Sequence, residues 1–245
     1  MSDIAKDIEK MLEGLGLTES TIRWKKLLDS PELGDLSPQQ LLREVLTPQY
    51  VETMNRKYET NLKFSKLIDR YAAIENLKTG NGRKYNDDIV KQILTLRFIA
   101  NHLNIGTYGK TGAGKSYFMS ALCNEACRQN YRCMMVDYCD LLDELMILSQ
   151  KKELEKYSKK LKYYSRIRLL FIDDFCISRY SEDGIKILYH LLKSRGDLGH
   201  STVFTCQYAP NEWGMKLSDS PDCFGNLDGI RRRLTSGYTV EIVKL

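Results

Sequence analysis

The most informative stretch of this 245-residue chain is Gly109-Lys110-Thr111-Gly112-Ala113-Gly114-Lys115-Ser116. It is a complete G-x-x-x-x-G-K-S sequence, placed between a short apolar run and a segment of helical periodicity that starts near Lys115. Glycines at this spacing let the backbone curl, so that its N–H groups converge on phosphate oxygens while the next helix directs its positive end at them. The stretch predicts a nucleotide-binding loop.

The side chains of this loop have expected tasks. Lys115 is expected to reach the β- and γ-phosphates of ATP, and the Ser116 hydroxyl is expected to ligate Mg²⁺. The predicted nucleotide contacts are Gly109, Lys110, Thr111, Gly112, Ala113, Gly114, Lys115, Ser116 and Tyr117.

A second motif, Leu169-Leu170-Phe171-Ile172-Asp173-Asp174, supplies two carboxylates. Four apolar residues in a row are typical of a strand buried in a parallel sheet, and such sheets bind ligands at the carboxyl ends of their strands. We expect Asp173 to be the outer-shell partner of Mg²⁺. Asp174 is placed to orient or deprotonate the water that attacks the γ-phosphate.

Beyond residue 86, short apolar runs alternate with helical segments. This alternation predicts an α/β fold, a three-layer sandwich around a central parallel sheet. Asn86 is expected to cap the helix that precedes the first strand. Five strands are expected, at 103–108, 133–137, 169–173, 202–207 and 238–243.

The first 71 residues predict a small all-helical domain that binds DNA or a partner, followed by the nucleotide-binding domain at 72–245. A first helix is indicated by an apolar stripe at Ile4, Ile8, Met11, Leu12 and Leu15. Ser37-Pro38 is a helix start, Pro48 is expected to end that helix, and a second helix is expected at 49–71. The segment 72–86, with two glycines, reads as a linker.

Composition excludes several classes of protein. The net charge is +5, from 37 Lys and Arg against 32 Asp and Glu, a slight preference for anionic partners. No stretch approaches the roughly 18 apolar residues of a membrane span, and the N-terminus has no secretory apolar region, so a cytoplasmic location is expected. The seven cysteines include no C-x-x-C pair. Cys123 and Cys127 could share a helix face, but no histidine or second pair completes a metal set, so free thiols are expected.

Taken together, these motifs resemble the AAA+ ATPases of the helicase-loader and initiator branch. The chain is most similar to the IstB-type transposition helper proteins and next to the DnaC-type helicase loaders. The resemblance spans nearly the whole chain. The more specific markers are Arg195, Ser201-Thr202 and the Thr-Cys-Gln sequence that precedes Pro210 and Trp213, in addition to the phosphate loop and the double Asp.

This resemblance implies an AAA+ P-loop fold without a C-terminal lid domain, because the chain stops at Leu245. It also implies that Gln207 senses the γ-phosphate and that Arg233 is an arginine finger, which would reach the nucleotide of a neighbouring subunit and tie hydrolysis to assembly. Several positions depart from the family pattern: Lys110-Thr111 stand where two prolines are frequent, Ser116-Tyr117 replace Thr-His, Cys206 replaces a serine, and Arg232 replaces an aspartate.

A basic segment predicts DNA binding. Between residues 151 and 168 lie eight Lys or Arg against two acids, with tyrosines interleaved. Cations of this density suit the phosphate backbone, and no base-reading motif is present, so contacts with little sequence preference are expected. The expected DNA-binding residues are Lys151, Lys152, Lys159, Lys160, Lys162, Arg56, Lys57 and Lys63.

The leading hypothesis is an ATPase that assembles on DNA through ATP at its subunit interfaces and presents target DNA to a transposase. A replicative helicase loader is the main alternative, because it would use the same ATP site. A small-molecule P-loop kinase and a non-hydrolysing ATP-switch scaffold remain as alternatives of another class.

Overall fold

The computed structural model describes residues 3–77, 79–80, 82–218 and 220–244. Contacts divide the chain into two units, Met1–Thr60 and Asn61–Leu245. The larger unit is built on a sheet of order β3-β4-β5-β2-β6, parallel throughout its described residues. Its strands are β2 (Ile105–Tyr108), β3 (Cys133–Asp137), β4 (Leu169–Phe175), β5 (Ser201–Cys206) and β6 (Tyr238–Glu241). The predicted five-stranded parallel sheet is therefore confirmed.

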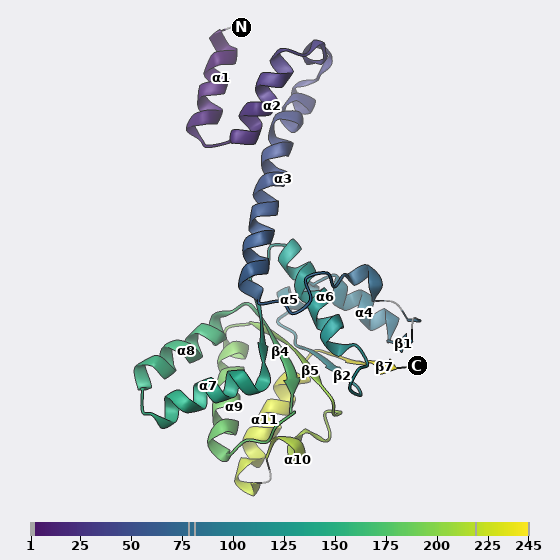
Figure 1. Ribbon diagram of the computed structural model, residues 1–245, viewed down its shortest axis with the longest axis vertical. Helices are drawn as coiled ribbons and strands as arrows, with labels where there is room; N and C mark the ends of the chain where they lie inside the picture. Colours follow the sequence, from purple (N-terminus) through teal and green to yellow (C-terminus); the bar gives the residue numbers. More distant parts are fainter. Residues whose placement is uncertain (1–2, 78, 81, 219, 245) are drawn as a thin grey trace. The chain divides into compact units, whose positions relative to one another are not determined.

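Helices cover both faces of this sheet and make the expected three layers (Figure 1). One face packs in a large apolar core against α7 (Tyr138–Gln150), α8 (Leu154–Arg166), α9 (Glu182–Asp197) and α11 (Phe224–Leu234). The other face is covered by α6 (Lys115–Arg128) and α4 (Asp87–Leu94), with the short α5 (Arg97–Ala100) beside them. Asn86 caps α4 as expected, since its side chain accepts a hydrogen bond from the Ile89 N–H at 3.2 Å.

Smaller elements complete this unit. A second sheet pairs β1 (Arg83–Lys84) antiparallel with β7 (Val243–Lys244). The remaining elements are η2 (Ile74–Asn76), α10 (Trp213–Leu217) and η3 (Pro221–Cys223). Across the described residues, no helix has the length and apolar character that crossing a membrane requires.

The smaller unit contains α1 (Asp3–Gly14), α2 (Thr18–Leu28), η1 (Pro31–Asp35) and the first part of α3 (Pro38–Ser65). Its core contains Ala5, Leu12, Trp24, Leu27 and Val45, and the Trp24 indole donates to the Ala5 carbonyl at 3.1 Å. The predicted apolar stripe of α1 is only partly buried, because Ile4, Met11 and Leu15 are exposed.

Pro48 does not end a helix, so the prediction of two helices divided there is wrong. One helix, α3, runs through it from Pro38 to Ser65. A proline inside a helix costs about 3 kcal/mol through a lost hydrogen bond and a ring clash. Contacts on both sides of the proline offset this cost: Val45 is buried in the core, and the Gln49 side chain accepts from the Glu19 N–H at 3.0 Å.

The division between the two units falls inside α3, between Thr60 and Asn61, whereas the sequence placed it after residue 71. The residues after the division pack within the larger unit. Leu62 and Leu67 are buried, and the Asn124 amide donates to the Ala72 carbonyl at 2.9 Å. A helix that continues without a break gives no sequence signal of such a boundary.

Candidate nucleotide-binding site

The glycine-rich loop joins β2 to α6 at the carboxyl edge of the sheet. Gly109 has φ +151°, and a Cβ there would lie 2.2 Å from the Ile242 carbonyl oxygen. Gly114 has φ +99° and immediately precedes α6. Only glycine tolerates such backbone without strain, so the two glycines allow the curl that opens the N-terminus of α6 toward a ligand.

Lys115 is the first residue of α6 and is nearly buried. Its Nζ donates to the carbonyls of Gly109 at 2.9 Å and Lys110 at 3.2 Å, so the ammonium is folded back over its own loop. Burial lowers the pKa of Lys115, and the nearby Asp174 and Asp173 carboxylates partly oppose that shift. The ammonium therefore lies beside both acids, where it could exchange loop carbonyls for phosphate oxygens.

Asp173 is the centre of a hydrogen-bond cluster. Its Oδ1 accepts from the Ser116 hydroxyl at 3.3 Å, from the Thr205 hydroxyl, and from the Asp174 N–H at 3.1 Å. Hydroxyl and carboxylate oxygens are the ligand types that Mg²⁺ prefers. The Ser116–Asp173 pair, at the mouth of the glycine loop, therefore fits a magnesium ion carried in with ATP.

Asp174 lies next to this cluster in an uncommon conformation. Its φ is +53°, and the pairing of β4 with β5 shifts register between Ile172 and Phe175. Irregularities of this kind redirect side chains beside functional sites. Burial raises the pKa of Asp174, and the Asp173 carboxylate raises it further. The arrangement gives Asp174 a higher proton affinity than an exposed aspartate, which suits a group that takes a proton from water.

Gln207 directly follows β5 at this carboxyl edge. The preceding residue, Cys206, accepts a backbone hydrogen bond from Gly109 at 3.2 Å, which places the end of β5 beside the phosphate loop. The Cys206 side chain is buried and accepts from the Tyr208 N–H at 3.4 Å, so it is part of the core.

Tyr117 and Arg83 connect the phosphate loop to the segment before it. The Tyr117 hydroxyl accepts from the Ala73 N–H at 3.3 Å and from the Asn76 amide at 3.1 Å. The Arg83 guanidinium lies over the Tyr117 ring at 5.8 Å, and its Nε would be 2.7 Å from a Cβ on Gly114. The sequence reasoning missed Arg83, because its place at the loop depends on the pairing of β1 with β7.

Arg233 lies at the opposite, amino edge of the sheet. Its carbonyl accepts from the side chain of Asn104, the residue before β2, at 2.8 Å. Its guanidinium donates to the Gly229 carbonyl at 3.0 Å and lies over the Tyr189 ring at 4.8 Å. β2 begins beside Arg233 and ends at the phosphate loop. Arg233 and Lys115 therefore lie near opposite ends of β2.

A basic pocket occupies the amino edge at the starts of β3 and β4. The cavity measures about 590 Å³, and none of the described residues that line it is acidic. The Arg132 guanidinium lies 4.0 Å from the centre of the Phe64 ring in this pocket. Two of the predicted DNA contacts, Lys159 and Lys162, belong to the lining, which consists of Phe64, Arg132, Lys159, Lys162, Tyr163, Arg166, Ile167 and Arg168.

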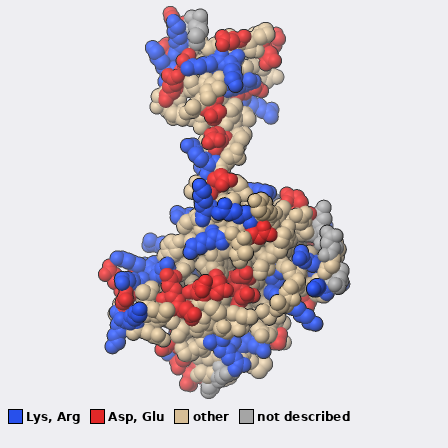
Figure 2. All heavy atoms as spheres, viewed as in Figure 1, with Lys and Arg blue, Asp and Glu red and all other residues tan. Residues whose placement is uncertain are grey.

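Lys160 turns from this pocket to the other side of α8. It pairs with Glu144 at 2.7 Å and lines a separate cavity of about 530 Å³ together with Asp137, Asp140 and Asp173. Figure 2 shows acidic side chains in a band across the face over α7, with basic side chains over the end of the α7–α8 hairpin. The acidic residues around Lys160 argue against a contact between its ammonium and a DNA phosphate.

The other predicted DNA contacts do not line this pocket. Lys151 and Lys152 lie in the exposed turn between α7 and α8. Lys63 is exposed on the last turns of α3 in the larger unit, whereas Arg56 and Lys57 are exposed in the smaller unit. The described residues therefore gather only Lys159 and Lys162 into one basic pocket.

Comparisons with known proteins agree with this site. The family model described as IstB-like ATP binding protein matches residues 11–231. A putative insertion sequence ATP-binding protein of Sinorhizobium fredii is 27% identical over 209 residues, which cover 85% of this chain and 82% of the relative. The IS5376 putative ATP-binding protein of Geobacillus stearothermophilus is 25% identical over 199 residues, or 81% of this chain and 77% of the relative.

Solved structures share the fold. DnaI has a TM-score of 0.59 at 20% identity, covering 71% of this chain and 92% of its own. The DnaC helicase loader gives 0.55 at 18% identity, with coverage of 71% and 98%. A replication initiator DnaA bound to AMPPCP and single-stranded DNA gives 0.56 at 20% identity, covering 72% of this chain and 51%, about half, of the initiator.

Proposed function

The chain belongs to the IstB-like ATP-binding proteins, and from this premise we propose that it is a DNA-stimulated ATPase that presents target DNA to a transposase. One observation carries the proposal: a single sheet has a candidate nucleotide site at its carboxyl edge and a basic pocket at its amino edge. The relatives named as insertion sequence proteins support a role in transposition rather than in helicase loading. The DnaI and DnaC structures support the fold that both roles would share.

The proposed hydrolysis uses residues of the carboxyl edge. The loop N–H groups and Lys115 hold the phosphates, once the Lys115 ammonium leaves the carbonyls of Gly109 and Lys110. Ser116 and Asp173 would hold Mg²⁺, which supplies neutralisation of the charge that develops on the phosphoryl oxygens. Asp174 accepts the proton of the attacking water, and Gln207 contacts the γ-phosphate. Arg233 serves the site of a neighbouring subunit.

Assembly on DNA tests this scheme. With duplex DNA and a non-hydrolysable ATP analogue, we expect sedimentation to show that wild type and Asp174→Ala assemble, whereas Lys115→Ala does not. In an ATPase assay, DNA should accelerate hydrolysis by wild type, and both variants should be inactive. Hydrolysis that is indifferent to DNA contradicts the proposal, an absence of hydrolysis would favour the scaffold, and phosphorylation of a small acceptor would favour a kinase.

We propose that the basic pocket contacts the DNA backbone. Among the described residues, Lys162, Arg166 and Arg168 are exposed and form no ion pair, so their charges are available to phosphates. Each neutralised phosphate releases counterions and adds about 0.9 to the slope of log affinity against log salt.

Charge removal tests this surface. The double variant Lys162→Gln and Arg166→Gln should bind duplex DNA about 10-fold more weakly in low salt, with a salt slope reduced by about 2. Lys156→Gln is the matched control: Lys156 lies on the same helix, pairs with Glu153 at 2.5 Å and does not line the pocket. An equal loss of DNA affinity in the double variant and in Lys156→Gln would mean that DNA binds elsewhere on the protein. ATP affinity, measured in parallel, should be unchanged in both.

A further inference from the structure

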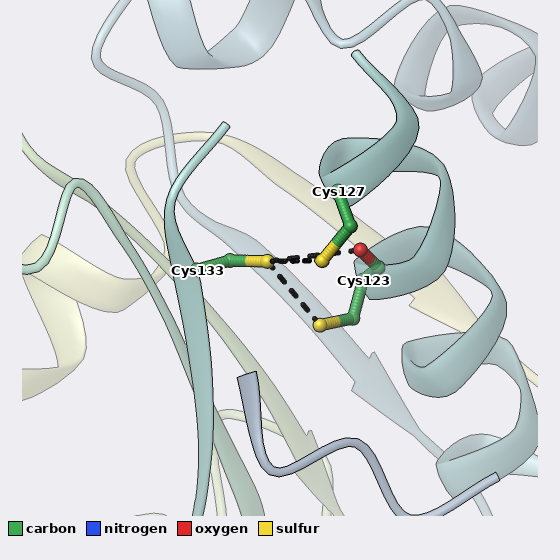
Figure 3. Close-up of side chains that lie close together, drawn as sticks. All are labelled: Cys123, Cys127 and Cys133. Atoms are coloured by element: carbon green, nitrogen blue, oxygen red, sulfur yellow. Dashed lines mark hydrogen bonds between the residues drawn. The ribbon is translucent and has the colours of Figure 1, made fainter. Parts of the chain in front are cut away.

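Three cysteines that are separate in the sequence meet inside the larger unit (Figure 3). Cys123 and Cys127 lie one turn apart on α6, and Cys133 is the first residue of β3. The Cys133 sulfur is 3.4 Å from that of Cys123 and 3.3 Å from that of Cys127. All three sulfurs lie within 4.8 Å of one another, and all three residues are 0% exposed. The sequence reasoning considered only the helical pair and missed the third thiol.

The spacing suits a metal ion held by three sulfurs. A metal–sulfur bond of about 2.3 Å places three sulfurs of a planar triangle about 4.0 Å apart. The observed separations of 3.3 Å, 3.4 Å and at most 4.8 Å lie on either side of that value, so rotations of the side chains would suffice. The sulfurs are well outside the roughly 2.05 Å of a disulfide bond.

The donor set identifies the class of ion. Zinc takes four ligands in structural sites, and within the described chain no further Cys, His, Asp or Glu joins the trio. Ser65 lies beside Cys127, but its hydroxyl donates to the Leu62 carbonyl at 2.8 Å, and hydroxyls are not usual zinc ligands. Soft sulfur donors that exclude water and harder ligands select Cu(I).

We propose that Cys123, Cys127 and Cys133 form a three-sulfur binding site for a soft monovalent metal ion, Cu(I). The binding step exchanges protons for the ion: Cu⁺ and three thiols give a complex of three thiolates with a net charge of −2, and three H⁺ are released. No oxidation state changes, so no further reactant is required.

Access to the site runs through one surface turn. Residues 129–132 connect α6 to β3, and Gln129 and Asn130 are exposed, as is Arg128, the last residue of α6. Cys133 follows this turn directly, and only Arg128 separates Cys127 from it. Opening of a short exposed turn is among the least costly local motions of a protein, and it would uncover two of the three sulfurs. A bound ion would then link the helix that follows the phosphate loop to a strand of the central sheet.

Copper binding to the reduced full-length protein tests the site. Under anaerobic conditions, a chromophoric Cu(I) chelator should yield one equivalent of Cu(I) to wild type. Single variants Cys123→Ser, Cys127→Ser and Cys133→Ser should each bind at least about 10-fold more weakly. Cys206→Ser is the matched control, because Cys206 is also buried and lies beside another thiol, Cys176. The Cys206→Ser variant should still bind one equivalent of Cu(I).

Wild type alone supplies a second measurement that does not depend on the variants folding. X-ray absorption of the copper-loaded protein should show three sulfur neighbours at about 2.3 Å and no nitrogen or oxygen neighbour. Two sulfurs, mixed ligands, or binding that persists in all three cluster variants would overturn the proposal. Failure of wild type to compete for Cu(I) would also overturn it and would leave the trio as packed core thiols.

Discussion

The carboxyl and amino edges of the central sheet are built in different ways. At the carboxyl edge, most of the functional side chains come from two contiguous motifs, residues 109–117 and 169–174, and Gln207 follows a third strand. At the amino edge, the basic pocket draws Phe64, Arg132, Lys162 and Arg168 from separate parts of the chain. Phosphate binding needs a loop with a fixed backbone shape, which a short sequence can encode. A diffuse positive surface needs only charge, which any segment can supply.

The two edges also differ in how their polar groups are satisfied. Asp174 combines a positive φ with a raised pKa, so its carboxylate is held at some cost to the fold. Arg195 at the amino edge is buried, and its guanidinium makes four hydrogen bonds: it donates to Thr202 Oγ1 at 2.9 Å, to the carbonyls of Tyr164 at 2.7 Å and Ile167 at 2.8 Å, and to that of Ser201. We therefore expect substitutions at the carboxyl edge to change activity more than stability. Substitutions at the amino edge should change stability more than activity.

Arg233 lies at the amino edge but is proposed to act at the carboxyl edge of a neighbouring subunit. If it completes the site of a neighbouring subunit, Arg233→Ala should slow DNA-stimulated hydrolysis by at least about 10³-fold, while ATP binding is retained. An equimolar mixture with Asp174→Asn should be more active than either variant alone, because the latter still supplies Arg233. Arg231→Ala is the control, since Arg231 is exposed and pairs with Asp228 at 2.9 Å. A mixture with no recovery would argue against a finger acting between subunits.

Asp174 itself tests the chemistry of the carboxyl edge. Asp174→Asn should reduce the rate of hydrolysis by about 10²–10⁴-fold, because the amide cannot accept the proton of water. Asparagine tolerates positive φ, so the backbone should not change. Wild-type activity should fall in acid as Asp174 protonates, at a higher pH than an exposed aspartate would give. Activity of the variant within a few-fold of wild type would assign the proton transfer to another group.

Arg195 tests the stability of the amino edge. Arg195→Met should lower the free energy of unfolding by about 3 kcal/mol, because several buried carbonyls lose their donor. Lys193→Met, an exposed change on the same helix, should stay within about 0.5 kcal/mol. Denaturant melts of both proteins provide the measurement. A small effect in Arg195→Met would mean that water replaces the guanidinium.

The smallest expected effect is a change in melting temperature when Asp174 is replaced. Because its pKa is raised, folding favours the protonated carboxyl, so this contribution to stability is present at low pH and is lost as the pH rises through the raised pKa. At neutral pH, Asp174→Asn should therefore melt slightly higher than wild type, by at most about 2–4 °C. The difference should shrink toward pH 4. A lower melting temperature for the variant would show that the carboxylate stabilises the fold.

Local signals predicted most of the fold and the nucleotide site. Apolar runs located the strands, because a parallel sheet buries both faces of each strand. Local sequence wrongly predicted a helix end at Pro48. The cost of a proline inside a helix is a local property, whereas the contacts of Val45 and Gln49 that offset it form only when the helices pack. Arg83 and Arg132 escaped notice because each acquires its neighbours only when distant segments pair. Cys133 escaped notice because it meets Cys127 only when the helix packs on the strand that follows it, although the two cysteines are six positions apart.

The sequence by itself determined the phosphate loop, the paired aspartates and the order of strands and helices, because these depend on residue type at short spacing. Only the tertiary structure decided which cations share a pocket, that Lys160 faces acids, and that three thiols meet behind the phosphate-loop helix. The physical reason is that backbone conformation is encoded over a few residues, whereas side-chain proximity depends on how the layers pack.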